Sequence, residues 1–273
     1  MEYLTCYRGD RIGMNVYARL ITMSFCHNNS SKYIYVHTPL PEPFESMFNL
    51  GMGCMRVTSA FNIHGRVNPP PFPTDLTPHI QWKREQLKCA ATKDCEQLPN
   101  FSDEFKRDII QRYKPFSQKD GGINICIHMR RGDTADLANT GNQFKRRRSS
   151  DDFLREVFQK INEFIKKPAN ITVHSDSALD MEKFETYGLK INTNFECAPE
   201  EAMRDMISCD ILFRSGLSSF SGVCAFYNEN LIISDMPDGY EDLYAAKNTY
   251  ALKDSSRRLK LINKKPSIAQ PIL

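Results

Sequence analysis

The sequence lacks the features that mark several large classes of protein. It has no apolar run of about 18 residues or more, which a membrane-spanning helix would need. Asp10 and Arg11 stand where a secretory signal peptide would have its apolar region, so we expect a cytoplasmic protein without a membrane span. The nine cysteines form an odd set with no CxxC pair, which indicates neither a zinc cage nor a redox dithiol.

Common nucleotide and metal signatures are also missing. The chain has no GxGxxG fingerprint and no GxxxxGK[ST] P-loop, so a dinucleotide-dependent enzyme and a P-loop NTPase both lack their motifs. A DxD carboxylate pair, typical of metal-dependent glycosyltransferases, does not occur either. We therefore expect no metal site and no cofactor.

The sequence also lacks a strong excess of either charge. There are 36 Lys and Arg residues against 33 Asp and Glu residues, a net charge of +3. Such a balance does not favour a general binder of nucleic acid or of membrane surfaces. The short basic run at 145–148 is typical of a solvated loop. A nucleic-acid partner is not expected.

What the chain does have is enough apolar material for more than one core. Its 273 residues are 41% hydrophobic, and domains usually hold about 100 to 200 residues. The stretch from Pro115 to Gly122 is rich in turn-forming residues and coincides with a change in composition. We place a domain boundary there and predict two domains, 1–118 and 119–273.

Both predicted domains alternate strands with helices. In the first, a strand near Tyr3, a glycine-bearing turn, a helix ending near Asn28 and a strand at 33–36 form a βαβ-like unit. Such alternation indicates a doubly wound α/β fold whose ligands bind at the carboxyl ends of parallel strands. In the second domain we predict strands at 123–129, 171–174, 211–214 and 231–234, with helices at 151–166, at 200–208 and from 219 onward.

The sharpest motif follows the first strand of the second domain. Residues 127–133 read Ile-His-Met-Arg-Arg-Gly-Asp, which places Arg130 and Arg131 at the carboxyl edge of the predicted sheet. Paired guanidinium groups suit a diphosphate, because each offers a planar fork of donors and a charge-assisted hydrogen bond contributes about 1.5 to 3 kcal/mol. A solvated charged turn is the alternative interpretation.

Two further polar segments follow neighbouring strands. Residues 215–222 form a serine-rich loop that opens a helix near Ser219, where exposed amides and hydroxyl groups favour an anion. Asp176 follows the strand at 171–174 and is placed to accept a hydrogen bond from a ribose or a base. In the first domain, the turn at 8–15 contains Gly9 and Gly13 and opens a helix.

These four segments, in this order, resemble the fucosyltransferase superfamily, chiefly the alpha-1,2-fucosyltransferases and more remotely the O-fucosyltransferases and alpha-1,6-fucosyltransferases. The H-x-R-R-G-D motif of that family is present at 128–133, and 218–221 matches the end of its S-x-S-S-F-S segment. The chain departs from the family where Gly222 to Ala225 replace a tryptophan-rich continuation.

The resemblance implies an α/β GT-B glycosyltransferase with two facing Rossmann-like doubly wound domains. The first, 1–118, would lie on the acceptor side, and the second, 119–273, would bind the nucleotide sugar. Arg131 would bind the donor diphosphate, supported by Arg130 and His128. The donor-binding residues that follow from the resemblance are Gly13, Asn15, His128, Arg130, Arg131, Asp176, Ser218, Ser219 and Phe220.

The expected chemistry is inverting and independent of metal. A hydroxyl group of a glycan acceptor would attack the anomeric carbon while the nucleoside diphosphate leaves, and Arg131 and helix amides would stabilise the developing charge. Asp133 and Asp136 are the candidate catalytic carboxylates, because they are the nearest in sequence to Arg130 and Arg131. GDP-fucose is the preferred donor. A UDP-xylose-dependent xylosyltransferase and a non-catalytic module that binds nucleotide sugars or glycans are the alternatives.

Overall fold

The computed structural model describes residues 2–4, 11–56, 101–113, 122–131, 149–215, 218–235 and 248–264. The chain divides into two compact units, Met1–Lys114 and Pro115–Leu273, whereas the sequence placed the boundary near residue 118. Within the described ranges, no helix combines the length and the apolar character needed to cross a membrane.

The N-terminal unit contains a small parallel sheet with the strand order β1-β2-β3. Helix α1 (Ile12–Asn28) connects β1 to β2 and packs against β2, which confirms the predicted βαβ unit. Two shorter helices complete its described part, and the sequence did not predict α2. The other elements are β1 (Glu2–Leu4), β2 (Tyr33–His37), α2 (Phe44–Phe48), β3 (Met55–Arg56) and α4 (Asp103–Arg112).

Two buried polar groups tie α1 and α2 to the segment that follows β2. Arg19 is 1% exposed, and its guanidinium donates to the carbonyl oxygens of Thr38 at 2.8 Å and Pro39 at 3.2 Å. The Glu45 carboxylate lies 2.9 Å from Nε2 of the buried His37. Burial alone would raise the Glu45 pKa, but the hydrogen bonds and nearby positive charge lower it below its usual range.

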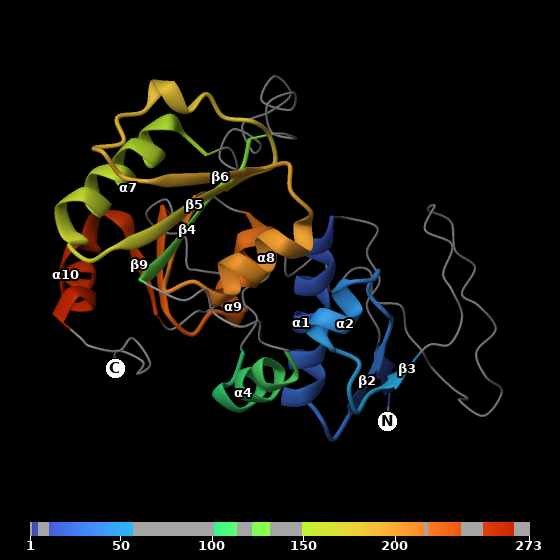
Figure 1. Ribbon diagram of the computed structural model, residues 1–273. Helices are drawn as coiled ribbons and strands as arrows, with labels where there is room; N and C mark the ends of the chain where they lie inside the picture. The colour runs from blue at the N-terminus through green and yellow to red at the C-terminus, as the bar shows by residue number, and fades with distance from the viewer. Residues whose placement is uncertain are drawn as a thin grey trace. The chain divides into compact units, whose positions relative to one another are not determined.

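The C-terminal unit is built on a six-stranded sheet in the order β6-β5-β4-β7-β8-β9, and every neighbouring pair is parallel (Figure 1). Four predicted strands lie within one or two residues of their expected bounds, and the sequence missed β6 and β9. The strands are β4 (Ile123–Met129), β5 (Ala169–Ser175), β6 (Ile191–Phe195), β7 (Ile211–Ser215), β8 (Leu231–Asp235) and β9 (Thr249–Ala251).

Helices cover both faces of this sheet, which explains why its central strands are buried on both sides. Helices α7 (Asp151–Phe164) and α10 (Ser256–Lys264) lie over one face, and α8 (Pro199–Ser208) and α9 (Ser219–Tyr227) lie over the other (Figure 1). This arrangement is Rossmann-like.

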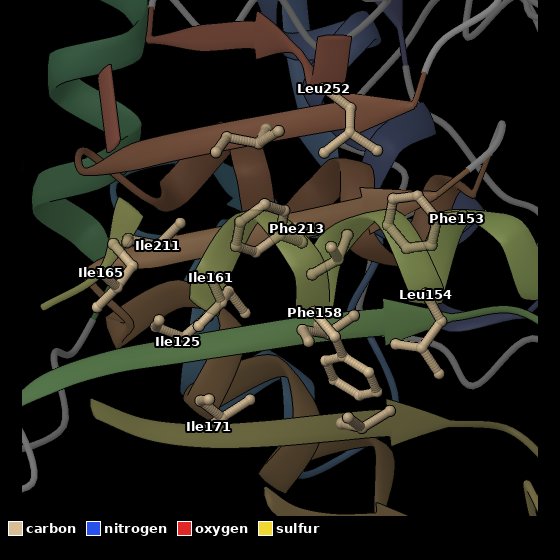
Figure 2. Packing of buried hydrophobic residues seen from close by; sticks show 14 of the residues in the cluster. Ile125, Phe153, Leu154, Phe158, Ile161, Ile165, Ile171, Ile211, Phe213 and Leu252 are labelled. Carbon is tan, nitrogen blue, oxygen red and sulfur yellow. The ribbon is translucent and has the colours of Figure 1, made fainter. Parts of the chain in front are cut away.

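The main hydrophobic core lies between the sheet and α7. Alternate residues of β4, Ile123, Ile125 and Ile127, belong to one buried cluster with side chains of α7. The five buried side chains of α7 recur with helical spacing, and Figure 2 shows Ile125 beside this helix. Ser150 caps the start of α7 by accepting a hydrogen bond from the Phe153 amide at 3.1 Å. The core thereby holds the start of α7 beside the end of β4.

Phe158 tests how far the unit depends on this core. Its side chain is fully buried in α7, and its ring meets that of Phe184 edge to face with centroids 6.4 Å apart. We expect Phe158→Ala to lower the free energy of unfolding by about 3 to 5 kcal/mol, because a cavity remains. Urea denaturation measures this. Gln159→Ala, at the next and exposed position of α7, should change the free energy of unfolding by less than about 0.5 kcal/mol. Equal effects of the two substitutions would contradict the assignment of Phe158 to the core.

Candidate functional site

The strand order of the C-terminal unit defines where a ligand would bind. In chain order, the strands β4, β5 and β6 extend to one side, and the chain then returns to place β7, β8 and β9 on the other side of β4. The order is therefore 3-2-1-4-5-6, which has its topological switch point between β4 and β7. In open α/β sheets of this kind, ligands bind outside the carboxyl ends of the strands at that point.

Arg130 and Arg131, called the arginine loop below, follow β4 at this switch point and are held by hydrogen bonds of their main chain. The Arg130 amide donates to Oγ of Ser149 at 2.7 Å, and the Ser149 amide donates to the Arg130 carbonyl oxygen at 3.0 Å. The Ser149 hydroxyl is also hydrogen-bonded to that of Ser215 at the end of β7. These contacts join the ends of β4 and β7 to the segment that precedes α7.

Arg131 is fixed at both its backbone and its side chain. Its amide donates to Oδ1 of Asp176 at 2.6 Å, which links the end of β4 to the end of β5. Its guanidinium forms an ion pair with Asp151 in the first turn of α7. The Arg131 side chain is 13% exposed, so it lies at the edge of the protein and not in bulk solvent.

Buried polar side chains of β4, β5 and β7 form a row on the face of the sheet that is turned away from α7. His128 of β4 is in register with His174 of β5 and with Arg214 of β7, and the three are at most 5% exposed. Nε2 of His174 lies 3.5 Å from a carboxylate oxygen of Asp205 on α8. Nη2 of Arg214 donates to the Ser218 carbonyl oxygen at 3.5 Å, just before α9. Positive charge therefore lies directly beneath the start of α9.

His128 is neutral in this setting. Burial, and to a smaller extent the nearby His174, Arg130 and Arg214, which disfavour another positive charge, together lower the pKa of its imidazole to about 3. Its ring lies against that of Phe220, with centroids 5.7 Å apart. Its Nδ1 has no hydrogen-bond partner among the described residues. His128 therefore supports the loop by packing and is not one of the cations of the site.

Helix α9 begins at the carboxyl edge of β7 without a side-chain cap. Ser218 occupies the N-cap position, and its hydroxyl is buried but has no partner in the described part of the chain. Ser219 and Phe220 follow in the first turn and are half-buried. Because the first amides of a helix are unpaired within the helix and carry partial positive charge, this end of α9 can accept an anion.

A pocket of about 350 Å³ opens on the β5 side of the arginine loop. It lies between the first turn of α7 and the connection from β5 to β6. Arg131 and Asp151 form one side of it. The remaining lining residues belong to that connection: Ser177, Ala178, Leu179, Asp180, Lys183 and Phe184.

The structure brings part of the predicted set of residues together. Arg131 contacts Asp176, and His128 contacts Phe220. Asn15 is in the N-terminal unit, where its side-chain oxygen accepts a hydrogen bond from Nη1 of the buried Arg19 at 3.2 Å. Of the other predicted residues, Arg130, Ser218 and Ser219 lie at the switch point, and Gly13 is buried in α1. Asp133 and Asp136 lie outside the described residues.

Sequence reasoning missed three residues that shape the site: Ser149, Asp151 and Arg214. Ser149 and Asp151 are far from the arginine motif in sequence, and only the return of the chain into α7 places them beside it. Arg214 was treated as the end of a strand, although a lone arginine within an otherwise apolar run was a usable signal. The described residues contain no group of three or more His, Cys, Asp or Glu side chains arranged to hold a metal ion.

No protein-family model matches the chain, and no curated protein sequence matches it. Among solved structures, it is similar to the apo-form glycosyltransferase GlyE of Streptococcus pneumoniae TIGR4, with a TM-score of 0.31 and 7% sequence identity. The alignment covers 51% of this chain and 32% of that chain.

The depressed pKa of His128 predicts a pH-dependent stability. The pKa in the folded state, about 3, lies below the ordinary value of about 6.5, so the unfolded state binds the proton first. The contribution of neutral His128 to the free energy of unfolding is therefore complete above pH 6.5. It is lost as the pH falls toward 3, by at most about 1.4 kcal/mol per pH unit. We expect His128→Asn to flatten the pH profile of the unfolding free energy in this range. His27→Asn, which removes a partly exposed histidine, should leave the wild-type slope; a wild-type slope in His128→Asn would refute the neutral, buried state.

Proposed function

We propose that the chain is a glycosyltransferase that binds the diphosphate of a nucleotide sugar at the switch point between β4 and β7. The observation that carries this proposal is the meeting of Arg131, Asp176 and the start of α9 on one edge of a Rossmann-like sheet. The guanidinium of Arg131 suits one phosphate, and the uncapped start of α9 suits the second. The carboxylate of Asp176 suits a ribose hydroxyl.

The Arg131 side chain is held by Asp151 through an ion pair at its Nη2 group. A guanidinium is planar and carries five N–H donors, a geometry that suits the oxygens of a phosphate. Asp151 and the hydrogen bond from the Arg131 amide to Asp176 fix the side chain before any ligand arrives, which reduces the entropy lost on binding. Arg131 is thus the main electrostatic group of the proposed donor site.

In the proposed reaction, an acceptor hydroxyl displaces the nucleoside diphosphate with inversion at the anomeric carbon. The bond from this carbon to the diphosphate oxygen breaks, and negative charge grows on the leaving group. Arg131 and the first amides of α9 would stabilise that charge without a metal ion. The acceptor proton would pass to a carboxylate, for which Asp133 and Asp136 remain the candidates from the sequence.

The donor is proposed to be GDP-fucose, because the arginine and serine motifs resemble those of fucosyltransferases. A UDP-sugar such as UDP-xylose would use the same diphosphate site with a different base. A glycan hydroxyl is the proposed acceptor in either case. A non-catalytic module would bind the nucleotide sugar and release no product.

A ligand panel tests the proposal directly. We expect GDP and GDP-fucose, in the presence of EDTA, to raise the melting temperature of the purified chain more than UDP, UDP-xylose or other nucleotide sugars do. Thermal shift measures this. Selective stabilisation by UDP and one UDP-sugar would move the enzyme to the alternative donor. Failure of every nucleotide, or stabilisation that depends on added Mn²⁺ or Mg²⁺, would contradict the proposed metal-independent site.

Arg131→Lys tests the role of the guanidinium. The substitution keeps the charge but removes the planar fork, so turnover should fall at least about tenfold, which corresponds to roughly 1.4 kcal/mol. Release of nucleoside diphosphate from the donor in the presence of an acceptor mixture reports turnover. Arg257→Lys, at an exposed position of α10, is the matched control and should retain full activity. Near wild-type turnover in Arg131→Lys would remove Arg131 from the diphosphate site.

A further inference from the structure

The pocket beside Arg131 is formed by a segment to which the proposed reaction assigns no role. Residues 177–184 leave the end of β5 and pass through the short helix η1 (Met181–Lys183) on the way to β6. Leu179 and the buried Phe184 give this pocket apolar walls. Arg131 and Asp151 close the end that faces the proposed diphosphate site. A ligand that fills the pocket would therefore be apolar on its faces and joined to an anion at one end.

Asp180 and Lys183 supply the polar edge of the pocket. They are three residues apart across η1, and Nζ of Lys183 lies 3.0 Å from Oδ2 of Asp180. Both side chains are more than half exposed, which leaves them accessible to a ligand. A carboxylate has about four acceptor positions and an ammonium has three donors, so each retains capacity beyond this ion pair. The pair thus presents an acceptor and a donor next to each other.

This order of groups matches one base among the common nucleotides. Guanine has the acceptor O6 beside two donors, the N1–H and the N2 amino group. A carboxylate can accept from both donors, while an ammonium donates to O6. Uracil offers a single N–H between two carbonyl groups, and adenine has its donor and acceptor in the reverse order.

We infer that this pocket binds the guanine base of the donor, with Asp180 accepting from N1–H and N2–H and Lys183 donating to O6. The inference rests on the proposed diphosphate site. In Rossmann-like sheets the nucleoside extends from the switch point over the second strand, where an acidic residue binds the ribose. Here the second strand is β5, Asp176 follows it directly, and the pocket lies just beyond. Asp180 and Lys183 are the residues that select the base.

Base recognition is measured with free nucleoside diphosphates and leaves the acceptor out of the experiment. Isothermal titration of the full chain with GDP, IDP, UDP and XDP gives four dissociation constants. IDP lacks the N2 amino group, so it should bind about tenfold more weakly than GDP, and UDP should be weaker still. Asp180→Asn should weaken GDP at least about tenfold and bind XDP better than GDP, because the carboxamide donates to the O2 of xanthine.

Two comparisons separate this inference from the proposed function. Glu156→Gln removes an exposed acidic residue of α7 that is paired with Lys160 and does not line the pocket, and it should keep the wild-type order of bases. Equal affinities for all four ligands, or an unchanged order in Asp180→Asn, would overturn the guanine pocket. Inorganic pyrophosphate is the second probe. If pyrophosphate binds but the four nucleotides bind equally well, the diphosphate site is supported and the guanine pocket is contradicted. If neither pyrophosphate nor any nucleotide binds, the diphosphate site and the guanine pocket are both contradicted.

Discussion

The pairing of β4 with β5 on one side and β7 on the other is the constraint on which the rest of the C-terminal unit depends. It aligns His128 with His174 and Arg214, and it makes the three strands end at one edge. Because helices cover both faces of β4, the chain can turn outward only at that edge. The arginine loop, the start of α9 and the start of the β5–β6 connection meet there as a result.

The charge at this edge of the sheet is carried by arginines and not by the histidine of the motif. His128 is kept neutral by burial, so the positive charge comes from the arginines. Arg214 is fully buried beneath α9, while Arg131 lies at the edge and is held by Asp151 and Asp176. This division places one fixed cation near solvent, where it is paired with Asp151, and a second one under a helix start.

The proposed diphosphate site and the proposed base pocket adjoin through Arg131. One surface of this residue closes the pocket and is engaged by Asp151, and its backbone holds Asp176 between the two. A nucleoside diphosphate would then lie along the edge from α9, past the end of β4, to the far side of β5. Selectivity for the base and stabilisation of the leaving group are thus assigned to different segments, so each can be altered without the other.

The sequence by itself determined the α/β class, four strands of the main sheet and the helices between them, because buried parallel strands are apolar runs and amphipathic helices have a regular period. It also located Arg131, Asp176 and Ser218, since polar residues that directly follow such strands must lie at one edge. Strand β6 escaped because its exposed positions are polar and leave no apolar run, and β9 escaped because it has only three residues. Only the tertiary structure decided that Asp151 pairs with Arg131 and that Asp180 and Lys183 border the same pocket, because these contacts depend on how the chain returns after each strand and not on any local pattern.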